Sequence, residues 1–292
     1  MRTSFNKRKT GILATLVAVL ASMALSYGQS PCDTLYFDSH GYEIRGYFYK
    51  SGTPASPTLI FSQGFMETGD IWNIGKTLSA KGINVFTFDF RGCFESVGKQ
   101  SLSNSLEDIG AALSFIKSDD LAAKYPLDTT RLVVGGYSFG GHMSMIQAVN
   151  DPSIKRVISI SGGDLGIFAQ QLDASQDLQI AYSGYFREIE KPDGPVDFEF
   201  EVPIKELLLN REHFDIYNQS AKLADVDILM VGGLDDSTVS MEDHILPLYR
   251  QLKKNKSQNI RCLIYQTNHS YKNVSGQLMH DLYDWIMYSK SR

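Results

Sequence analysis

The chain has 292 residues, of which 43% are hydrophobic and 21% charged, and its formal net charge is −5. This composition is typical of a folded domain and excludes an intrinsically disordered protein. A net negative charge argues against nucleic acid or an anionic membrane surface as a partner. The length allows one large core, or one core with an inserted subdomain.

The N-terminus has the pattern of a secretory signal peptide. Residues 7–9 are basic, residues 12–25 form an apolar run, and residues 26 and 28 are small, which fits cleavage after residue 28. We therefore expect residues 1–28 to be removed. The remaining chain would be exported to the periplasm or the medium, with no stable membrane span.

Two alternatives to a cleaved signal stay open. The apolar run could remain as an anchor, although it is shorter than the roughly 20 residues of a membrane span. Cys32 could be lipidated, although Pro31 directly before it is unfavourable for that modification. The three cysteines, Cys32, Cys93 and Cys262, show neither paired zinc spacing nor a disulfide framework.

Short apolar runs without clean alternation recur along residues 29–292, as expected for parallel strands that are covered on both faces. They are preceded by a hairpin pattern around residues 39–41. We expect the hairpin at Thr34–Phe37 and Glu43–Tyr49, and parallel strands at Thr58–Ser62, Val85–Asp89, Leu132–Tyr137, Val157–Ser161, Ile228–Val231 and Cys262–Gln266.

Helical patterns lie between these runs. Residues 105–108 read as a capping box that opens a helix, and Gln277–Met287 forms a last amphipathic helix. Alternating strands and helices predict an α/β fold with a mostly parallel sheet and an N-terminal antiparallel hairpin.

One interval interrupts the alternation. About sixty residues separate the strand that ends at Ser161 from the next strand, and a structureless loop of that length is improbable in a compact domain. We expect an inserted cap at about residues 164–224. Its middle, residues 181–201, is rich in aromatic and acidic side chains.

The most informative motif is Gly136-Tyr137-Ser138-Phe139-Gly140, which ends an apolar strand and runs into a helical segment. Strand, tight turn and helix are the context in which G-x-S-x-G forms a nucleophile elbow. A serine hydroxyl needs a base, and the base needs an orienting acid. The motif therefore predicts Ser138 as a nucleophile with partners further along the chain.

The acid partner is expected after the strand Ile228–Val231, where the sequence reads Gly232-Gly233-Leu234-Asp235-Asp236. A carboxylate just beyond the carboxyl end of a strand lies on the rim where such sheets bind ligands. Both aspartates fit this position, and either could instead cap the following helix. We favour Asp236 over Asp235 because it stands third after Gly233.

The base is predicted to be His269, in the loop between the last strand and the last helix. From there an imidazole can reach Ser138. The other histidines are more consistent with structural or solvated positions: His40, His142, His213, His244 and His280.

A tetrahedral intermediate needs two preorganised N–H donors. One is expected to be the N–H of Phe139, directly after the nucleophile. The second is expected to be the N–H of Phe65 in the loop Gln63-Gly64-Phe65-Met66.

These motifs together resemble an α/β-hydrolase of the small esterase and serine-aminopeptidase-like group. The resemblance runs from about Ser39 to Trp285 and includes residues 61–65 with Trp72, residues 88–92, the elbow, and Asn268-His269-Ser270. It implies the α/β-hydrolase fold and a triad of Ser138, His269 and Asp236, with Phe65 and Phe139 as oxyanion donors. It implies no cofactor and no metal.

Two positions depart from the group. Gln63 stands where the group has histidine, and Phe94 stands where it has glycine. We expect Gln63 to change how the oxyanion loop is held and Phe94 to narrow the pocket mouth.

The expected activity is hydrolysis of carboxylic esters. A first alternative is a serine peptidase that trims short peptides, in which the acids Glu188, Glu190, Asp193, Glu199 and Glu201 would hold a free amino group. A second is a hydrolase fold that serves as a non-catalytic binding module. The substrate itself and the oligomeric state are left open.

Overall fold

A computed structural model describes residues 32–125, 127–190, 196–199, 201–257 and 259–288 of the chain. The signal peptide predicted at residues 1–28 lies outside the described residues, as does Asp193. In the described ranges, no helix combines the length and apolar character that crossing a bilayer requires.

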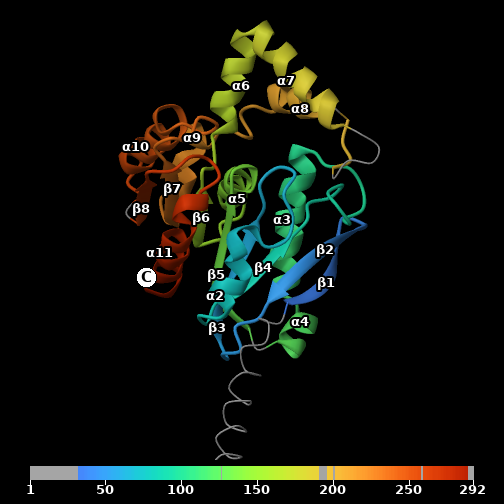
Figure 1. Cartoon of the computed structure of the whole chain (residues 1–292), viewed down its shortest axis with the longest axis vertical. Helices are drawn as coiled ribbons and strands as arrows, with labels where there is room; N and C mark the ends of the chain where they lie inside the picture. Colours follow the sequence, from blue (N-terminus) through green and yellow to red (C-terminus); the bar gives the residue numbers. More distant parts are fainter. Residues whose placement is uncertain (1–31, 126, 191–195, 200, 258, 289–292) are drawn as a thin grey trace, which may run out of the picture.

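The core of the molecule is an eight-stranded sheet with strand order β1-β2-β4-β3-β5-β6-β7-β8 (Figure 1). β1 and β2 form an antiparallel hairpin, and β2 pairs antiparallel with β4. The pairs from β4 to β8 are all parallel. This arrangement confirms the predicted fold class and its N-terminal hairpin.

Each predicted apolar run lies within or overlaps a strand, and most strands extend past it by one or more residues. The strands are β1 (Cys32–Ser39), β2 (Tyr42–Tyr49), β3 (Ser56–Ser62), β4 (Asn84–Phe88), β5 (Leu127–Tyr137), β6 (Arg156–Ile160), β7 (Asp227–Gly233) and β8 (Ile260–Tyr265).

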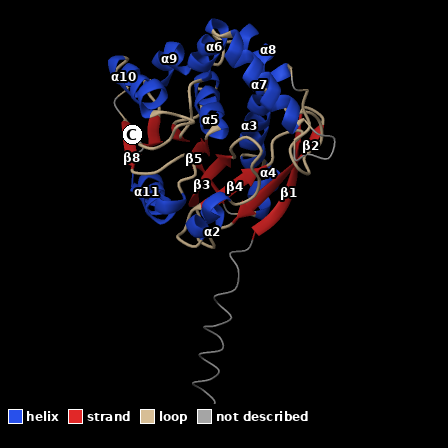
Figure 2. Ribbon diagram, turned by 45° about the horizontal axis from the view of Figure 1, so that its top comes forward, coloured by secondary structure: helices blue, strands red, loops and turns tan. Residues whose placement is uncertain are grey.

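Helices cover both faces of the sheet, which is why the central strands are mostly buried and rich in apolar residues (Figure 2). One face packs against α2 (Ile74–Ser79) and α11 (Ser275–Tyr288). The other packs against α3 (Leu102–Ile116), α5 (Phe139–Asn150) and α10 (Leu246–Lys254). A short helix, α4 (Asp119–Lys124), follows α3.

The start of α3 differs from the prediction. The helix begins at Leu102, and Ser101 is its N-cap, with its side chain accepting from the N–H of Asn104 at 3.1 Å. Ser105 lies inside the first turns and donates to the Ser101 carbonyl. The predicted capping box at residues 105–108 is therefore wrong.

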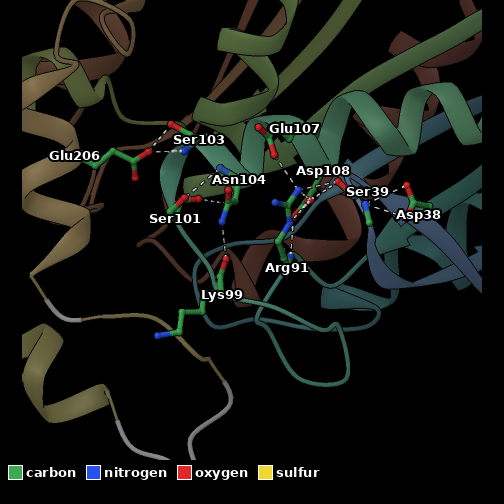
Figure 3. A network of polar contacts seen from close by, with 12 residues as sticks. Asp38, Ser39, Arg91, Lys99, Ser101, Ser103, Asn104, Glu107, Asp108 and Glu206 are labelled. Atoms are coloured by element: carbon green, nitrogen blue, oxygen red, sulfur yellow. Dashed lines mark hydrogen bonds and ion pairs between the residues drawn. The ribbon is translucent and has the colours of Figure 1, made fainter.

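The physical reason is that Asp108 has a tertiary role. Its side chain is buried and accepts from the backbone N–H of Arg91 at 2.7 Å, from the Arg91 guanidinium at 2.9 Å and from Ser39 Oγ at 2.6 Å (Figure 3). This network joins α3, the loop after β4 and the hairpin. A buried arginine held in this way fixes the base of the loop that approaches the elbow.

The described residues of the segment predicted as a cap, residues 164–224, include four α-helices and a short 3-10 helix, Ser220–Leu223, between β6 and β7. In Figure 1, α6, α7 and α8 stand above the edge of the sheet, and α7 contains no fully buried residue. The helices are α6 (Leu165–Ala174), α7 (Gln176–Ile189), α8 (Val202–Leu209) and α9 (Ile216–Gln219). We call residues 164–224 the cap segment.

Polar contacts attach the cap segment to the body of the domain. Glu206 of α8 accepts from the N–H groups of Leu102 and Ser103 at 2.8 and 2.9 Å, at the N-terminus of α3 (Figure 3). Lys99 and Glu199 form an exposed ion pair. The Asp197 carbonyl accepts from the N–H of Gln100 at 2.8 Å. The connection before α8 is thus fixed to the loop before α3.

Candidate active site

The predicted elbow is formed at the junction of β5 and α5. Ser138 has φ of 52° and ψ of −118°, a backbone conformation that non-glycine residues rarely adopt. Its N–H donates to the Ile160 carbonyl of β6 at 2.8 Å, which anchors the turn to the neighbouring strand. Such strain costs about 1–3 kcal/mol and persists where the surrounding structure enforces it.

Two glycines make this turn possible. A Cβ on Gly136 would lie 2.4 Å from the Gly140 carbonyl carbon, and a Cβ on Gly140 would lie 2.2 Å from the Ser62 carbonyl oxygen. Both contacts are with backbone, which cannot move aside. Glycine is therefore required at both positions, as the G-x-S-x-G pattern indicated.

The structure brings the three predicted triad residues together. His269 Nε2 lies 3.0 Å from Ser138 Oγ, and His269 Nδ1 lies 2.8 Å from Asp236 Oδ2. Because the carboxylate can only accept, Nδ1 carries the proton and Nε2 of the neutral ring is free to accept from the serine hydroxyl. The order hydroxyl, imidazole, carboxylate is the one that activates a serine.

Asp236 is fixed by a dense set of donors. Its Oδ1 accepts from the N–H groups of Thr238 and Val239 at 3.0 and 2.9 Å, and Oδ2 accepts from His269 and from Ser161 Oγ. Burial alone would raise the pKa of Asp236, but the hydrogen bonds from His269, Val239 and Ser161 outweigh it and lower that pKa. The carboxyl group therefore stays ionised beside the imidazole.

Asp235, the competing candidate, points elsewhere. Its side chain is exposed and accepts from Gln266 Nε2 at 2.6 Å. Of the two aspartates, Asp236 is the one that contacts His269, and Asp235 contacts Gln266.

Sequence reasoning missed two residues that support Asp236. Ser161 follows β6, is fully buried and donates to Asp236 Oδ2 at 2.7 Å. Because that hydroxyl hydrogen is directed at the carboxylate, Ser161 Oγ accepts from the hydroxyl of buried Tyr271, 2.7 Å away. The position of Ser161 at a strand's carboxyl end was an available signal for it. Nothing in the local sequence marks Tyr271.

Aromatic side chains hold the loop that carries His269. The Tyr137 hydroxyl donates to the His269 carbonyl at 2.7 Å, and Trp72 Nε1 donates to the Ser270 carbonyl at 2.8 Å. The Tyr137 ring lies 5.1 Å from the imidazole centroid. The histidine is thus positioned by residues that flank the elbow and the oxyanion loop.

The two predicted oxyanion residues lie on neighbouring elements. Phe139 is the first residue of α5, where N–H groups lack a partner within the helix. Phe65 lies in the loop after β3, and its ring meets the Phe139 ring edge to face at 6.1 Å. Gln63, which departs from the group, donates through Nε2 to the Gly69 carbonyl and so bridges the base of this loop.

Glu67 is an unpredicted acid in the same loop. Burial raises its pKa, and the Gly64 backbone and the nearby His269 partly oppose that rise. Its Oε2 is buried and finds no hydrogen-bond partner among the described residues. Gly64 is crowded by this carboxyl, because a Cβ there would lie 2.7 Å from Glu67 Oε2.

A cavity of about 290 Å³ opens beside Ser138, under the cap segment. Its wall is mostly aromatic and aliphatic. The body of the domain contributes Phe65 and Phe139, and the cap segment contributes Phe168, Tyr182, Phe186 and Leu207. Such a cavity suits an apolar part of a small molecule.

Phe94 does not behave as expected. It is absent from the cavity wall, and its ring is 40% exposed. The preceding residue, Cys93, is buried and pairs through its backbone with Val196 in an isolated β-bridge, and Phe94 has a φ of 52°. The predicted narrowing of the pocket mouth is wrong.

The acidic cluster also lies away from the cavity. Glu199 pairs with Lys99 at 2.9 Å, and Glu188, Glu190 and Glu201 take no part in the cavity wall. In the part of the chain that the structure describes, no cluster of three or more His, Cys, Asp or Glu could hold a metal ion.

Comparison with known proteins finds similarity over part of the chain. The family model described as BD-FAE matches residues 62–178, which include the oxyanion loop and the elbow. The quorum-quenching protein AidA of Acinetobacter baumannii is 30% identical over 138 residues, covering 45% of this chain and 43% of that protein. The chain thus spans less than half the length of this relative.

Solved structures share the fold at low sequence identity. Est1E from Butyrivibrio proteoclasticus superimposes with a TM-score of 0.60 at 17% identity, covering 87% of this chain and 97% of Est1E. An acylaminoacyl peptidase from Pyrococcus horikoshii gives 0.65 at 15% identity, covering 91% of this chain and 42% of the peptidase. The strand order and these matches together show that the chain has the α/β-hydrolase fold.

Proposed function

We propose that this protein is a serine hydrolase that cleaves carboxylic esters, with Ser138 as nucleophile, His269 as general base and Asp236 as orienting acid. The observation that carries the proposal is the alignment of these three groups, with 3.0 Å between Ser138 Oγ and His269 Nε2 and 2.8 Å between His269 Nδ1 and Asp236 Oδ2. Hydrogen-bond reach from nucleophile to base and from base to acid is the geometric requirement for this chemistry.

In the first step, His269 accepts the Ser138 proton while Oγ attacks the ester carbonyl. Asp236 stabilises the imidazolium that forms, and it stays ionised. The N–H groups of Phe65 and Phe139 stabilise the oxyanion of the tetrahedral intermediate. His269 then gives its proton to the leaving alcohol, and Ser138 carries the acyl group.

In the second step, His269 accepts a proton from water as the water attacks the acyl-enzyme carbonyl. A second tetrahedral intermediate forms and collapses. His269 returns the proton to Ser138 Oγ, and the carboxylic acid leaves. These chain groups account for every proton that moves, so the proposed reaction uses water as its only co-substrate.

The character of the cavity supports an ester over a peptide. Phe65, Tyr182 and Phe186 offer apolar surface next to Ser138, which suits an acyl or aryl group. A peptidase that holds a free amino group needs an available acid facing that space. The described members of the acidic cluster lie outside the wall, and Asp164, which does line the cavity, already accepts from the N–H groups of Gly166 and Tyr217.

The test is labelling of the purified protein with a fluorophosphonate, followed by a panel of 4-nitrophenyl esters and aminoacyl-anilides. We expect label on Ser138, no label on a Ser138→Ala protein, and turnover of esters in excess of anilides. Label that persists in Ser138→Ala would exclude this nucleophile. Turnover of anilides alone would favour the peptidase, and neither label nor turnover would favour a binding module.

We also propose that the protein is exported, on the strength of the basic and apolar pattern in residues 1–28. N-terminal sequencing of the protein recovered outside the cytoplasm tests this proposal. We expect the mature chain to begin at Gln29 or at a residue next to it. A first residue elsewhere would contradict the proposed cleavage site.

A further inference from the structure

The cavity beside Ser138 has a polar end that the proposed reaction does not use. Most of its wall is apolar, but two histidines, His142 of α5 and His244 of the π-helical turn Met241–Ile245, also line it. Both lie against the backbone at residues 163–165, where the cap segment begins. Neither histidine belongs to the triad.

His142 has an unsatisfied nitrogen. The residue is buried, and its Nδ1 faces the backbone, 3.4 Å from the N–H of Leu165. Its Nε2 is buried and has no hydrogen-bond partner among the described residues. Buried polar atoms are almost always paired, so this atom calls for a partner that the protein itself does not supply.

The Nε2–H group of His244 is a hydrogen-bond donor. Its Nδ1 accepts from the backbone N–H of Asp164 at 3.2 Å, and therefore the proton of the neutral ring resides on Nε2. No described protein group accepts from that Nε2 in the structure. Burial lowers the pKa of both His142 and His244, so both rings are neutral at physiological pH.

The nearby acid, Asp164, already accepts hydrogen bonds from backbone N–H groups. Asp164 Oδ1 accepts from the N–H of Gly166 at 2.8 Å, and Oδ2 accepts from the N–H of Tyr217 at 2.8 Å. The carboxylate thereby caps α6 and holds α9. It is unavailable to pair with His142 or His244, so Nε2 of neither ring has an acceptor among the described residues.

We propose that His142 and His244 form a subsite that binds a neutral oxygen, a carbonyl or a hydroxyl, on the acyl part of the ester at a distance from the scissile bond. This inference rests on the proposed function, and it specifies the substrate class. Neutral imidazoles at the end of an apolar cavity match an uncharged hydrogen-bonding group. A carboxylate there would lose its hydration without gaining a cation.

The test uses pairs of 4-nitrophenyl esters with the same chain length and the same leaving group. One member carries a straight acyl chain, and the other carries a ketone, placed in turn at each position beyond the ester carbonyl. We expect one ketone position to raise kcat/KM by about fivefold, the effect of one net hydrogen bond of about 1 kcal/mol. The best position reports the depth of the subsite.

Two variants assign the preference to the histidines. His244→Leu and His142→Leu should bring the ratio of kcat/KM for the preferred oxo ester over its plain partner to within about twofold of unity. His280→Leu is the matched control, since His280 lies on the exposed face of α11 beside Asp284. It should leave the ratio as in the wild type.

The outcomes separate the subsite from the proposed function. A wild-type protein that cleaves plain esters but prefers no oxo ester would overturn the subsite, as would a preference that survives in His244→Leu. If His142→Leu fails to fold, His244→Leu decides alone. If no ester is cleaved, calorimetric titration of the Ser138→Ala protein with each ester pair still compares binding. Equal affinities there would reject the subsite, and tighter binding of an oxo ester would support it.

Discussion

The carboxyl edge of the sheet and the cap segment share one cavity but are built differently. At the sheet edge, Ser161 and Tyr271 are fully buried and Asp236 is 3% exposed, and each is held by hydrogen bonds from distant parts of the chain. In the cap segment, α7 covers the cavity without one fully buried residue. The groups proposed for chemistry are thus fixed by the core, whereas α7, which forms part of the cavity roof, packs loosely against its neighbours.

This contrast teaches where changes should matter. Catalytic geometry must be held closely, and the sheet edge achieves this with buried networks. Contacts with a variable part of a substrate tolerate a less rigid support. Substitutions at the sheet edge should therefore affect every substrate, and substitutions in the cap segment should affect stability and substrate choice modestly.

The largest expected effect is the loss of the nucleophile. Ser138→Ala should reduce kcat for 4-nitrophenyl esters by about 10⁶-fold, because triad members act as a unit. The change removes one partly buried oxygen at a turn that glycines already shape, and we expect the thermal unfolding midpoint to change little. Activity is measured by nitrophenolate release, and folding by circular dichroism. A residual rate within about 100-fold of the wild type would contradict the assignment.

The second effect tests the sheet edge through its acid. Asp236→Asn should lower kcat by about 10⁴-fold, because an amide cannot hold the imidazole in the reactive tautomer. The pKa of Asp236 is lowered in the folded protein, so its contribution to stability is present at neutral pH. That contribution is lost as the pH falls through the lowered value.

The neighbouring aspartate is the matched control. Asp235→Asn makes the same chemical change one residue away, at an exposed side chain that contacts Gln266 instead of His269. We expect its kcat to stay within about threefold of the wild type, as for surface substitutions away from a site. The reverse pattern, with Asp235→Asn crippled and Asp236→Asn active, would show that the acid is misassigned.

A third prediction concerns the pH dependence of stability at the border between the two regions. Burial lowers the pKa of His142 to about 3, whereas the unfolded residue binds a proton near its ordinary value of about 6.5. Between these two pH values the unfolded state binds more protons than the folded state. The contribution of His142 to the free energy of unfolding therefore falls as the pH falls. From pH 7.5 to pH 5 the loss is about 2 kcal/mol.

The comparison of wild type with His142→Asn isolates this contribution. The raised pKa of Asp164, about 6, acts in the opposite direction in both proteins and cancels in the difference. Urea unfolding at pH 7.5 and pH 5 should show a smaller loss of unfolding free energy on acidification for the variant. Equal losses in the two proteins would mean that His142 is protonated in the folded state.

The sequence predicted the sheet edge far better than the cap segment. The strands, the elbow and the position of Asp236 depend on local apolar runs, on glycines and on the ends of strands, which can be recognised along the chain. His269 follows β8 for the same reason. The core therefore places the predicted groups where local patterns indicated.

The sequence could not predict contacts that join distant segments. Ser161 reaches Asp236 across 75 residues and Tyr271 across 110, and neither pairing leaves a local pattern. The start of α3 was misplaced because Ser101 and Ser105 both suit an N-cap, and the choice depends on Asp108 pairing with Arg91. Phe94 was misjudged because its exposure leaves no local pattern: the residue before it, Cys93, is buried and forms a β-bridge with the distant Val196.

The smallest expected effect comes from the attachment of the cap segment. Glu206 accepts from two N–H groups at the N-terminus of α3, where a carboxylate also interacts favourably with the helix dipole (Figure 3). Glu206→Gln keeps the size and an accepting oxygen but removes the charge and the second acceptor. We expect a loss of about 1 kcal/mol in the free energy of unfolding, with kcat for a short acetyl ester within about twofold of the wild type.

Glu212→Gln is the control for this change, since Glu212 is an exposed acid of the same segment and its side chain takes part in no cap contact that the structure describes. It should unfold at the wild-type urea concentration. If Glu206→Gln lowered kcat for the acetyl ester as strongly as Asp236→Asn does, the cap segment would be fixing the catalytic groups. The conclusion that the sheet edge alone fixes the catalytic groups would then be wrong. A loss of stability with retained kcat would instead show that Glu206 stabilises the cap segment without positioning the catalytic groups.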